Sequence, residues 1–210
     1  ISDSRVGTST PLTSTTLNRE AIEDNNISGA LPYIMEMEPS MVSTAENGTQ
    51  VGNTSFRIRG TDATRINVNI NGIPLNNAES QGVYWVNIVN LAAMSESVQI
   101  QRGTGASNGG TSAFGGAISL QTLNPSTEAY ATADISRGSF NTNQTSLMVS
   151  TGLLKHGWAF DASYSKLSSD GFLRNGFCDH ESFYFSGGKY GERSLLKLVA
   201  IIGKQHTGIT

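Results

Sequence analysis

Strict alternation of apolar and polar residues runs through most of the chain after residue 130, and few folds accommodate it. Five segments of eight or more residues show it, among them WAFDASYS from residue 158 and ESFYFSGG from residue 181. Successive side chains of a β-strand point to opposite faces, so each segment predicts a strand with one apolar face. The connections are short at residues 155–157 and 191–192 and longer at residues 168–179. Strands of about ten residues joined in this way are typical of transmembrane β-barrels.

The alternation alone leaves a second interpretation open, because a soluble antiparallel sheet with one packed face has the same period. The length of the segments favours the membrane. Aromatic residues near the predicted strand ends agree, because the interfacial girdles of a barrel lie there. These residues are Trp158, Phe172, Phe177 and Tyr190.

The first 122 residues mix short helices with short strands. Charged residues make up 15% of the chain and glycine 23 of its 210 residues, which is typical of a turn-rich and strand-rich protein. The predicted fold is an α+β domain over residues 1–122, a small mixed sheet with short helices. Antiparallel β-strands of an incomplete transmembrane β-barrel follow over residues 123–210. Within the first part we expect helices that begin near Asn18 and Ser28, a glycine-rich loop over 103–116, and strands over 12–17, 55–59, 65–70, 97–102 and 117–122.

The segment SFRIRGTDATRINVNINGIPL, residues 55–75, predicts two short strands separated by a polar tip at residues 61–64. Its second strand alternates from Ile66 to Ile70, and Asn71-Gly72 then predicts a tight reversal, because both residues tolerate a positive φ. A tip of this kind is suited to presenting polar side chains to another molecule.

Four motifs stand in a fixed order: Phe56-x-Ile58-Arg59-Gly60, Asn71-Gly72-Ile73-Pro74-Leu75, Ile100-x-Arg102-Gly103 and Gly115-Gly116-Ala117-Ile118. In order and spacing they resemble the plug domain of TonB-dependent outer-membrane receptors, over about residues 10–122. The chain from residue 128 resembles the first barrel strands that follow such a plug. Residues 60–88 are similar to the Bacteroidetes branch of the family, and differ from its starch-utilisation type, which has Tyr-Val-Val-Asp-Gly where this chain has Val-Asn-Ile-Asn-Gly.

The resemblance implies an importer in the bacterial outer membrane and not an enzyme. A barrel of about 22 strands would enclose the plug. Its expected partners are membrane lipid, a small extracellular ligand, and periplasmic TonB, which would pull a segment upstream of Ile1. The family most often imports ferric siderophore or haem, and glycan or cobalamin uptake stays open as an alternative.

The resemblance also implies site residues. Three plug loops, residues 46–53, 61–64 and 77–85, are expected to face the ligand. Arg59 and Arg102 resemble plug arginines that pair with barrel glutamates as a plug–barrel latch. From the residues alone, local pairing of these arginines with Asp62 or Glu96 is the alternative, and Tyr84 and Trp85 could be core residues. The predicted ligand contacts are Gln50, Asp62, Glu79, Gln81, Tyr84 and Trp85.

Other sites have weaker support. The net charge of −3, with no cluster of Lys and Arg, argues against nucleic acid as a partner. The glycine-rich loop carries Thr111 where a phosphate-binding loop needs Lys. Cys178-Asp179-His180 lacks further ligands at metal-binding spacing, so we expect no metal and no cofactor.

Five strands cannot close a barrel, and the chain starts at Ile1 without a Met or a signal peptide. We therefore expect it to be part of a longer receptor. A soluble secreted α+β ligand-binding module stays open as the alternative.

Overall fold

The computed structural model describes residue 5 and residues 12–26, 30–88, 90–104, 113–191 and 194–208. The chain forms two compact units, which are described separately below. Unit 1 comprises Ile1–Ala45, Thr54–Trp85 and Leu91–Leu123, and unit 2 comprises Glu46–Asn53, Val86–Asn90 and Asn124–Thr210. Two short segments from the first half of the sequence thus belong to the same unit as the strands of the second half.

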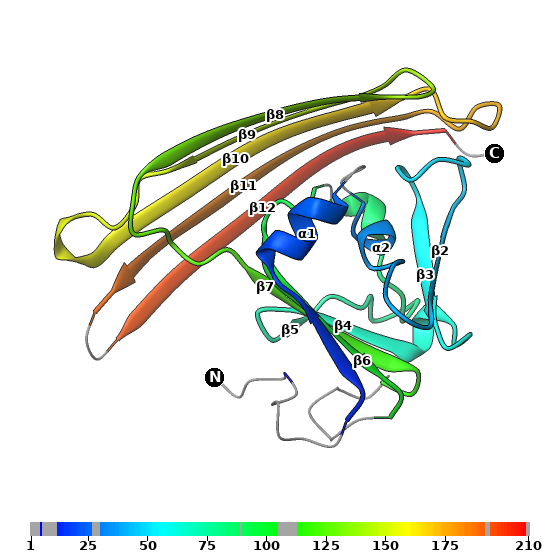
Figure 1. The fold of residues 1–210 in the computed structure, drawn as a ribbon, viewed down its shortest axis with the longest axis horizontal. Coiled ribbons are helices and arrows are strands. Elements are labelled where there is room, and N and C mark those ends of the chain that lie inside the picture. The colour runs from blue at the N-terminus through cyan, green and yellow to red at the C-terminus, as the bar shows by residue number, and fades with distance from the viewer. Residues whose placement is uncertain are drawn as a thin grey trace. The chain divides into compact units, whose positions relative to one another are not determined.

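Unit 1 is built on a mixed five-stranded sheet (Figure 1). Its strands β4 and β7 are parallel and the other neighbouring pairs antiparallel, as expected for an α+β domain. Asn71 and Gly72 have φ values of 51° and 80° and join β4 to β5, which confirms the predicted tight turn. In spatial order the strands are β1 (Ser14–Leu17), β6 (Ser95–Arg102), β7 (Gly116–Thr122), β4 (Ile66–Ile70) and β5 (Ile73–Pro74).

Two short helices, α1 (Arg19–Asn25) and α2 (Leu31–Ile34), contribute to the core of unit 1. The Asn18 side chain accepts a hydrogen bond from the Ala21 amide, which confirms the predicted N-cap. The predicted cap at Ser28 lies outside the described residues, as do residues 105–112 of the glycine-rich loop. The fully buried side chains include Ile22, Ile34, Met35, Ile66, Leu91, Met94, Ile100, Ile118 and Leu120.

The two strands predicted at residues 55–59 and 65–70 are both present, on either side of the predicted tip, but they do not pair with each other. Strand β3 (Thr54–Ile58) pairs instead with β2 (Met41–Ala45), a strand that the sequence did not predict. Arg59 and Gly60 adopt positive φ values of 51° and 76°, and the 3-10 helix η1 (Ala63–Arg65) follows. This turn changes the direction of the chain. Strand β4 therefore pairs within the five-stranded sheet and does not pair with β3.

Unit 2 contains five antiparallel strands that pair in chain order, and the 3-10 helix η4 (Lys155–Gly157) precedes the third of them (Figure 1). The strands contain 9 to 13 residues, the length expected of transmembrane strands. They are β8 (Tyr130–Gly138), β9 (Thr142–Ser150), β10 (Trp158–Ser169), β11 (Cys178–Tyr190) and β12 (Leu195–Thr207). No helix within the described residues is long and apolar enough to cross a membrane.

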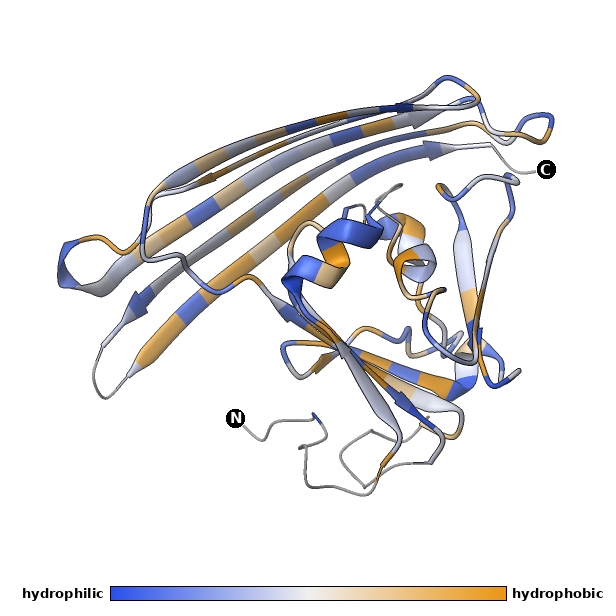
Figure 2. Ribbon diagram, viewed as in Figure 1, coloured by the Kyte–Doolittle hydropathy of each residue, from blue (hydrophilic) through white to orange (hydrophobic). Residues whose placement is uncertain are grey.

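One face of this sheet, here called the apolar face, carries exposed hydrophobic side chains. Figure 2 shows hydrophobic and hydrophilic residues interspersed along these strands. Leu147, Tyr164, Phe183 and Ile202 form one row across four strands, and each is more than 40% exposed. The opposite face, here called the serine face, is buried on β9, β10 and β11. Its residues include Ser146, Ser150, Ser163, Ser165, Ser182 and Ser186.

Charged groups bound the apolar face along β10. At one end Lys166 pairs with Glu181 at 3.0 Å, and at the other the Lys189 ammonium lies 5.8 Å from the Trp158 ring centroid. Residues 158 and 166 are about 27 Å apart along a strand, or about 20 Å along the membrane normal at the usual tilt. This span is close to the apolar band of about 25 Å that an outer-membrane barrel presents to lipid.

Candidate functional site

The predicted ligand loop at residues 77–85 is held in place by the amide side chain just before it. Asn76 accepts a hydrogen bond from the Val68 amide at 2.7 Å, and its own amide donates to the Ile66 carbonyl at 2.9 Å. The same amide donates to the Gln81 carbonyl at 2.8 Å. Asn76 therefore extends the edge of β4 as a strand residue would, and it ties the loop to the sheet.

Within this loop, Asn77 organises the tip. Its side-chain oxygen accepts hydrogen bonds from the amides of Glu79 and Ser80, at 2.9 and 3.0 Å. Its backbone closes the turn, because its amide donates to the Gly82 carbonyl and its carbonyl accepts from the Gln81 amide. An Asx turn of this kind fixes the backbone, and the Gln81 side-chain amide adds a hydrogen bond to the Ala78 carbonyl at 3.1 Å.

Three of the predicted ligand contacts lie in this loop. Glu79 and Gln81 are exposed, and Tyr84 is 51% exposed. They offer a carboxylate, an amide and a phenol, which can bind the polar groups of a small molecule while the Tyr84 ring covers an apolar part of it. We name Glu79, Gln81 and Tyr84 the 79–84 cluster.

Trp85 is buried in unit 1, although it was predicted to contact the ligand. It is only 6% exposed, and its ring centroid is 5.6 Å from that of Phe56 on β3. This position differs from the predicted exposed ligand contact, because the indole packs into the core of unit 1 at the start of the 3-10 helix η2 (Trp85–Asn87). An aromatic ring beside an exposed tyrosine is not assigned to core or surface by sequence alone.

Asp62 serves as the N-cap of η1. Its carboxylate accepts hydrogen bonds from the Thr64 amide at 2.9 Å and from the Thr64 hydroxyl at 2.8 Å. These two bonds lower the pKa of Asp62 below its ordinary value, with smaller contributions from the charges of Arg57 and Arg65. The side chain is exposed, but its hydrogen-bonding capacity is largely directed to its own turn.

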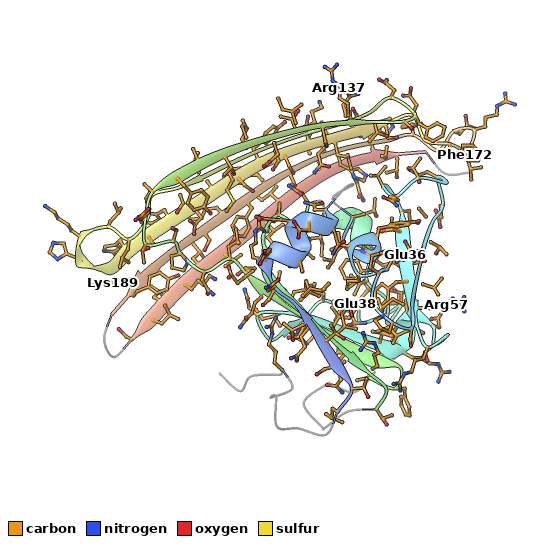
Figure 3. All side chains as sticks on the ribbon, viewed as in Figure 1. Glu36, Glu38, Arg57, Arg137, Phe172 and Lys189 are labelled. Carbon is orange, nitrogen blue, oxygen red and sulfur yellow. The ribbon has the colours of Figure 1, made fainter. Side chains whose placement is uncertain are left out.

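The loop Glu46–Asn53 joins β2 to β3, whereas Asp62 follows the other end of β3, so this hairpin does not bring Gln50 and Asp62 together. Within unit 2, the loop packs against the connection between β10 and β11, where Figure 3 labels Phe172. The Asn47 carbonyl accepts hydrogen bonds from the amides of Phe172 and Leu173, at 3.0 and 3.2 Å. Val51 joins Leu167 and Cys178 in a buried apolar cluster, while Gln50 stays exposed.

Arg102 has a partner within unit 1. Its guanidinium donates to the Glu38 carboxylate at 3.1 Å and to the Pro39 carbonyl at 2.9 Å, and its side chain is 5% exposed. Figure 3 labels Glu38. The partner is neither the predicted barrel glutamate nor Asp62 or Glu96. A buried guanidinium needs a nearby anion, and Glu38 on the turn between α2 and β2 supplies one.

Arg59 differs from Arg102. It is exposed, its backbone amide donates to the Ser40 carbonyl, and no carboxylate among the described residues lies within 4.0 Å of its guanidinium. The side chain is therefore accessible to an acidic group from another part of a larger protein.

The sequence analysis did not identify three residues that hold these loops and Arg102 in place. They are Glu38, Asn47 and Asn76. The doublet Asn76-Asn77 directly after a predicted strand was the only available signal, since asparagine side chains often bond to nearby backbone in turns. Among the described residues, no group of three His, Cys, Asp or Glu side chains could hold a metal ion.

Comparison with protein families gives one match. Residues 7–117 match the family described as TonB-dependent Receptor Plug Domain, which is more than half of the chain. No curated protein matches the chain.

Solved structures share its fold at low sequence identity. The pyoverdine outer-membrane receptor FpvA of Pseudomonas aeruginosa, bound to pyoverdine, has a TM-score of 0.75 at 18% identity over 93% of this chain. The copper transporter OprC has a TM-score of 0.74 at 16% identity over 98%, and the siderophore receptor PirA of Acinetobacter baumannii 0.72 at 16% over 91%. This chain covers 28%, 32% and 31% of the respective proteins.

Proposed function

Since this chain belongs to the TonB-dependent receptor plug family and lies in the bacterial outer membrane, we propose that it is the plug and first barrel strands of an importer. The importer takes up a scarce extracellular nutrient, a ferric siderophore or haem, and releases it to the periplasm when TonB pulls the plug. Membership of the family favours this function over the soluble secreted module that strand periodicity alone left open.

The observation that carries the proposal is the 79–84 cluster. Asn76 and Asn77 fix its backbone, while the side chains of Glu79, Gln81 and Tyr84 remain exposed. A preorganised loop with a few polar groups and one aromatic ring binds a small ligand at a low entropic cost. Gln50, on the predicted loop at residues 46–53, is also exposed and is proposed as a further contact.

The cargo is proposed from the relatives. The named proteins with the same fold include a pyoverdine receptor, a ferric citrate transporter and a copper transporter. Two of these three proteins bind or transport a ligand that carries or chelates iron. This supports a ferric chelate as the cargo of the proposed importer. Glycan or cobalamin remains the alternative cargo, because cargo is read by side chains that differ between receptors.

Arg59 is proposed as the arginine of the plug–barrel latch. It is exposed and has no described carboxylate nearby, as such a role requires. Arg102, whose charge is already met by Glu38, is proposed to stabilise the plug from within.

Uptake by the full-length receptor in its native host tests the proposal. A panel of iron-55 siderophores and haem is offered to cells that carry the wild type or Tyr84→Ala. The expected result is energy-dependent uptake of one panel member, with a rise in half-saturating concentration of about tenfold for Tyr84→Ala. The matched control, Tyr130→Ala, changes an exposed tyrosine on β8. Uptake of no iron chelate, together with uptake of a glycan or cobalamin, would overturn the ferric assignment.

A further inference from the structure

Asp161 is a buried carboxylate on the serine face of β10. It is only 3% exposed, and its Oδ1 atom is buried without a hydrogen-bond partner. Among the described residues, no nitrogen of a Lys, Arg or His side chain lies within 4.0 Å of this carboxylate. Taking an ionised carboxylate out of water is costly unless a positive charge or hydrogen bonds compensate it. Asp161 therefore needs a counter-charge that its described surroundings do not supply.

Hydroxyl groups lie next to Asp161 on the same face. Ser150 and Ser186 are its direct partners on β9 and β11, and Ser163 follows two residues along β10. All three serines are buried. The Cβ atoms of directly opposite residues in an antiparallel pair are about 4.5 to 5.5 Å apart, so one small ion can reach the carboxylate and a hydroxyl on either side. Carboxylate and hydroxyl oxygens are suited to a hard cation.

The next residue pair along these strands is also small. Ala159 on β10 pairs with Gly188 on β11, one position nearer to η4 on the same face. A Cβ atom at Gly188 would lie 3.1 Å from the Tyr190 ring, so this ring packs directly against the glycine backbone. Asp161 thus has serines on both neighbouring strands and alanine and glycine toward η4. None of these side chains is bulky enough to fill the space beside the carboxylate.

We propose that Asp161 and the hydroxyls of Ser150, Ser163 and Ser186 bind an alkali metal cation within the strands of unit 2. The site holds one carboxylate, so a monovalent ion neutralises it, whereas a divalent ion would leave a buried net charge. Three of its four ligands are hydroxyls, so the site differs from the clusters of His, Cys, Asp and Glu considered above. The proposal goes beyond import, because it requires neither cargo nor TonB.

A bound cation would connect three strands. The proposed ligands come from β9, β10 and β11, and the ion would add contacts between side chains to the backbone ladders of these strands. An ion that binds only the folded state stabilises it in proportion to its concentration relative to its dissociation constant. The stability of the receptor should therefore depend on which cation the buffer contains, at a constant ionic strength.

Thermal unfolding of the full-length receptor in detergent micelles, followed by circular dichroism, tests the site. The wild type is compared in sodium, potassium, calcium and choline chloride, each at an ionic strength of about 0.2 M, so that screening is equal. We expect a Tm at least about 3 °C higher in the sodium or the potassium salt than in choline chloride. The same Tm in all four salts would overturn the proposal. A rise in calcium chloride alone would overturn the assignment to an alkali cation.

Asp161→Asn separates a cation site from a carboxylate that the protein itself compensates. The variant removes the charge at almost constant size. We expect its Tm to be the same in all four salts and, in choline chloride, no lower than that of the wild type. A lower Tm in choline chloride would show that protein groups already stabilise the charge, and would contradict the proposal. The matched control is Asp134→Asn, which changes an exposed carboxylate on the same face of β8 and should keep the wild-type response to salt.

Two further variants test the ligands and a rival counter-charge. Ser186→Ala should reduce the difference in Tm between sodium and choline chloride at least about twofold, because it removes one oxygen ligand. Ser165→Ala is its control, since that hydroxyl lies 2.7 Å from the Ser182 hydroxyl and is not a proposed ligand. Lys197 shares the serine face on β12, and Lys197→Met should keep the response to sodium. A response that appears only in Lys197→Met would identify this lysine as the counter-charge and overturn the proposal. None of these measurements needs a ligand or TonB, so failure of the uptake assay and failure of the cation site are distinguishable.

Discussion

The two five-stranded sheets of this protein have the same period-two sequence pattern and opposite patterns of burial. In unit 1, the apolar side chains of β4, β6 and β7 are buried in a core. In unit 2, the serine face is buried and the apolar face is exposed, with Leu198 63% and Ile202 64% exposed. The period of a strand thus fixes which residues share a face, and the surroundings of the sheet decide which face is covered.

The charged residues show the same contrast. Unit 1 places the Arg102–Glu38 pair in its interior, where each charge depends on the other. Unit 2 places Lys166 and Glu181 at the boundary of its apolar face, where both are more than a third exposed. An interior pair is expected to be costly to break and a boundary pair nearly neutral.

The largest effect is expected from breaking the interior pair. Arg102→Met leaves the Glu38 carboxylate partly buried without its partner, and we expect the free energy of unfolding to fall by about 3 to 5 kcal/mol. Urea unfolding followed by tryptophan fluorescence measures it, since Trp85 lies in the same unit. The matched control is Glu23→Gln, which breaks the exposed helix pair with Arg19 and should change the free energy of unfolding by less than about 1 kcal/mol.

A double-mutant cycle sharpens this result. Arg102→Met with Glu38→Gln should show a coupling free energy above about 1.5 kcal/mol, because the two groups are in direct contact. A coupling near zero would mean that Arg102 finds its partner elsewhere in the full receptor, as the predicted latch to a barrel glutamate requires.

The next effect tests the exposed apolar face. Val149→Arg places a charge in the middle of the proposed lipid band, opposite Ala162, and we expect a loss of about 2 to 4 kcal/mol for the full-length protein folded in lipid vesicles. Asn143→Arg, on the same strand and face but beyond the Lys166 row, should cost about 0 to 1 kcal/mol. Equal costs at both positions would contradict the membrane assignment of this face.

Sequence reasoning predicted unit 2 well, because each of its strands carries a long uninterrupted alternation that no helix could share. The strand from Trp158 and the turn at residues 155–157 are in the structure where the pattern places them. In unit 1 the same reasoning found β1, β3, β4, β6 and β7. It missed β2, because the sequence MVSTA does not alternate apolar and polar residues.

The pairing of β3 and the partner of Arg102 could not be predicted for a related reason. Whether β3 joins β2 or β4 depends on the backbone angles of Arg59 and Gly60, which the residue types permit but do not require. Glu38 lies 64 residues from Arg102 in the chain, so no local pattern connects them. The exposed Glu79, Gln81 and Tyr84 were foreseen because a polar loop between strands has few other places to lie.

A smaller effect is expected at the edge of β4. Asn76→Ala removes three hydrogen bonds at a half-buried position, and we expect a loss of about 1 to 3 kcal/mol. The amide of Val68, which donates to Asn76, should exchange with solvent faster. Asn77→Ala is the control, because it removes the local turn but leaves the Val68 bond. Unchanged protection of Val68 in Asn76→Ala would show that the side chain is not part of the sheet edge.

The smallest expected effect is on the pH dependence of stability, and it comes from the exposed carboxylate of Asp62. The pKa of Asp62 is lowered in the folded state, chiefly because the ionised carboxylate accepts the Thr64 amide and hydroxyl. A depressed folded pKa stabilises the fold above the unfolded value of 3.8, and this contribution is lost as pH falls through the lower folded pKa. Asp62→Asn should therefore lower stability slightly at pH 6 and have less effect near pH 3.

Thr64→Val keeps the backbone donor but removes the hydroxyl, so NMR titration should find an Asp62 pKa between that of the wild type and 3.8. A wild-type pKa in Thr64→Val would show that the backbone amide alone holds the carboxylate, since only the hydroxyl bond separates the two proteins.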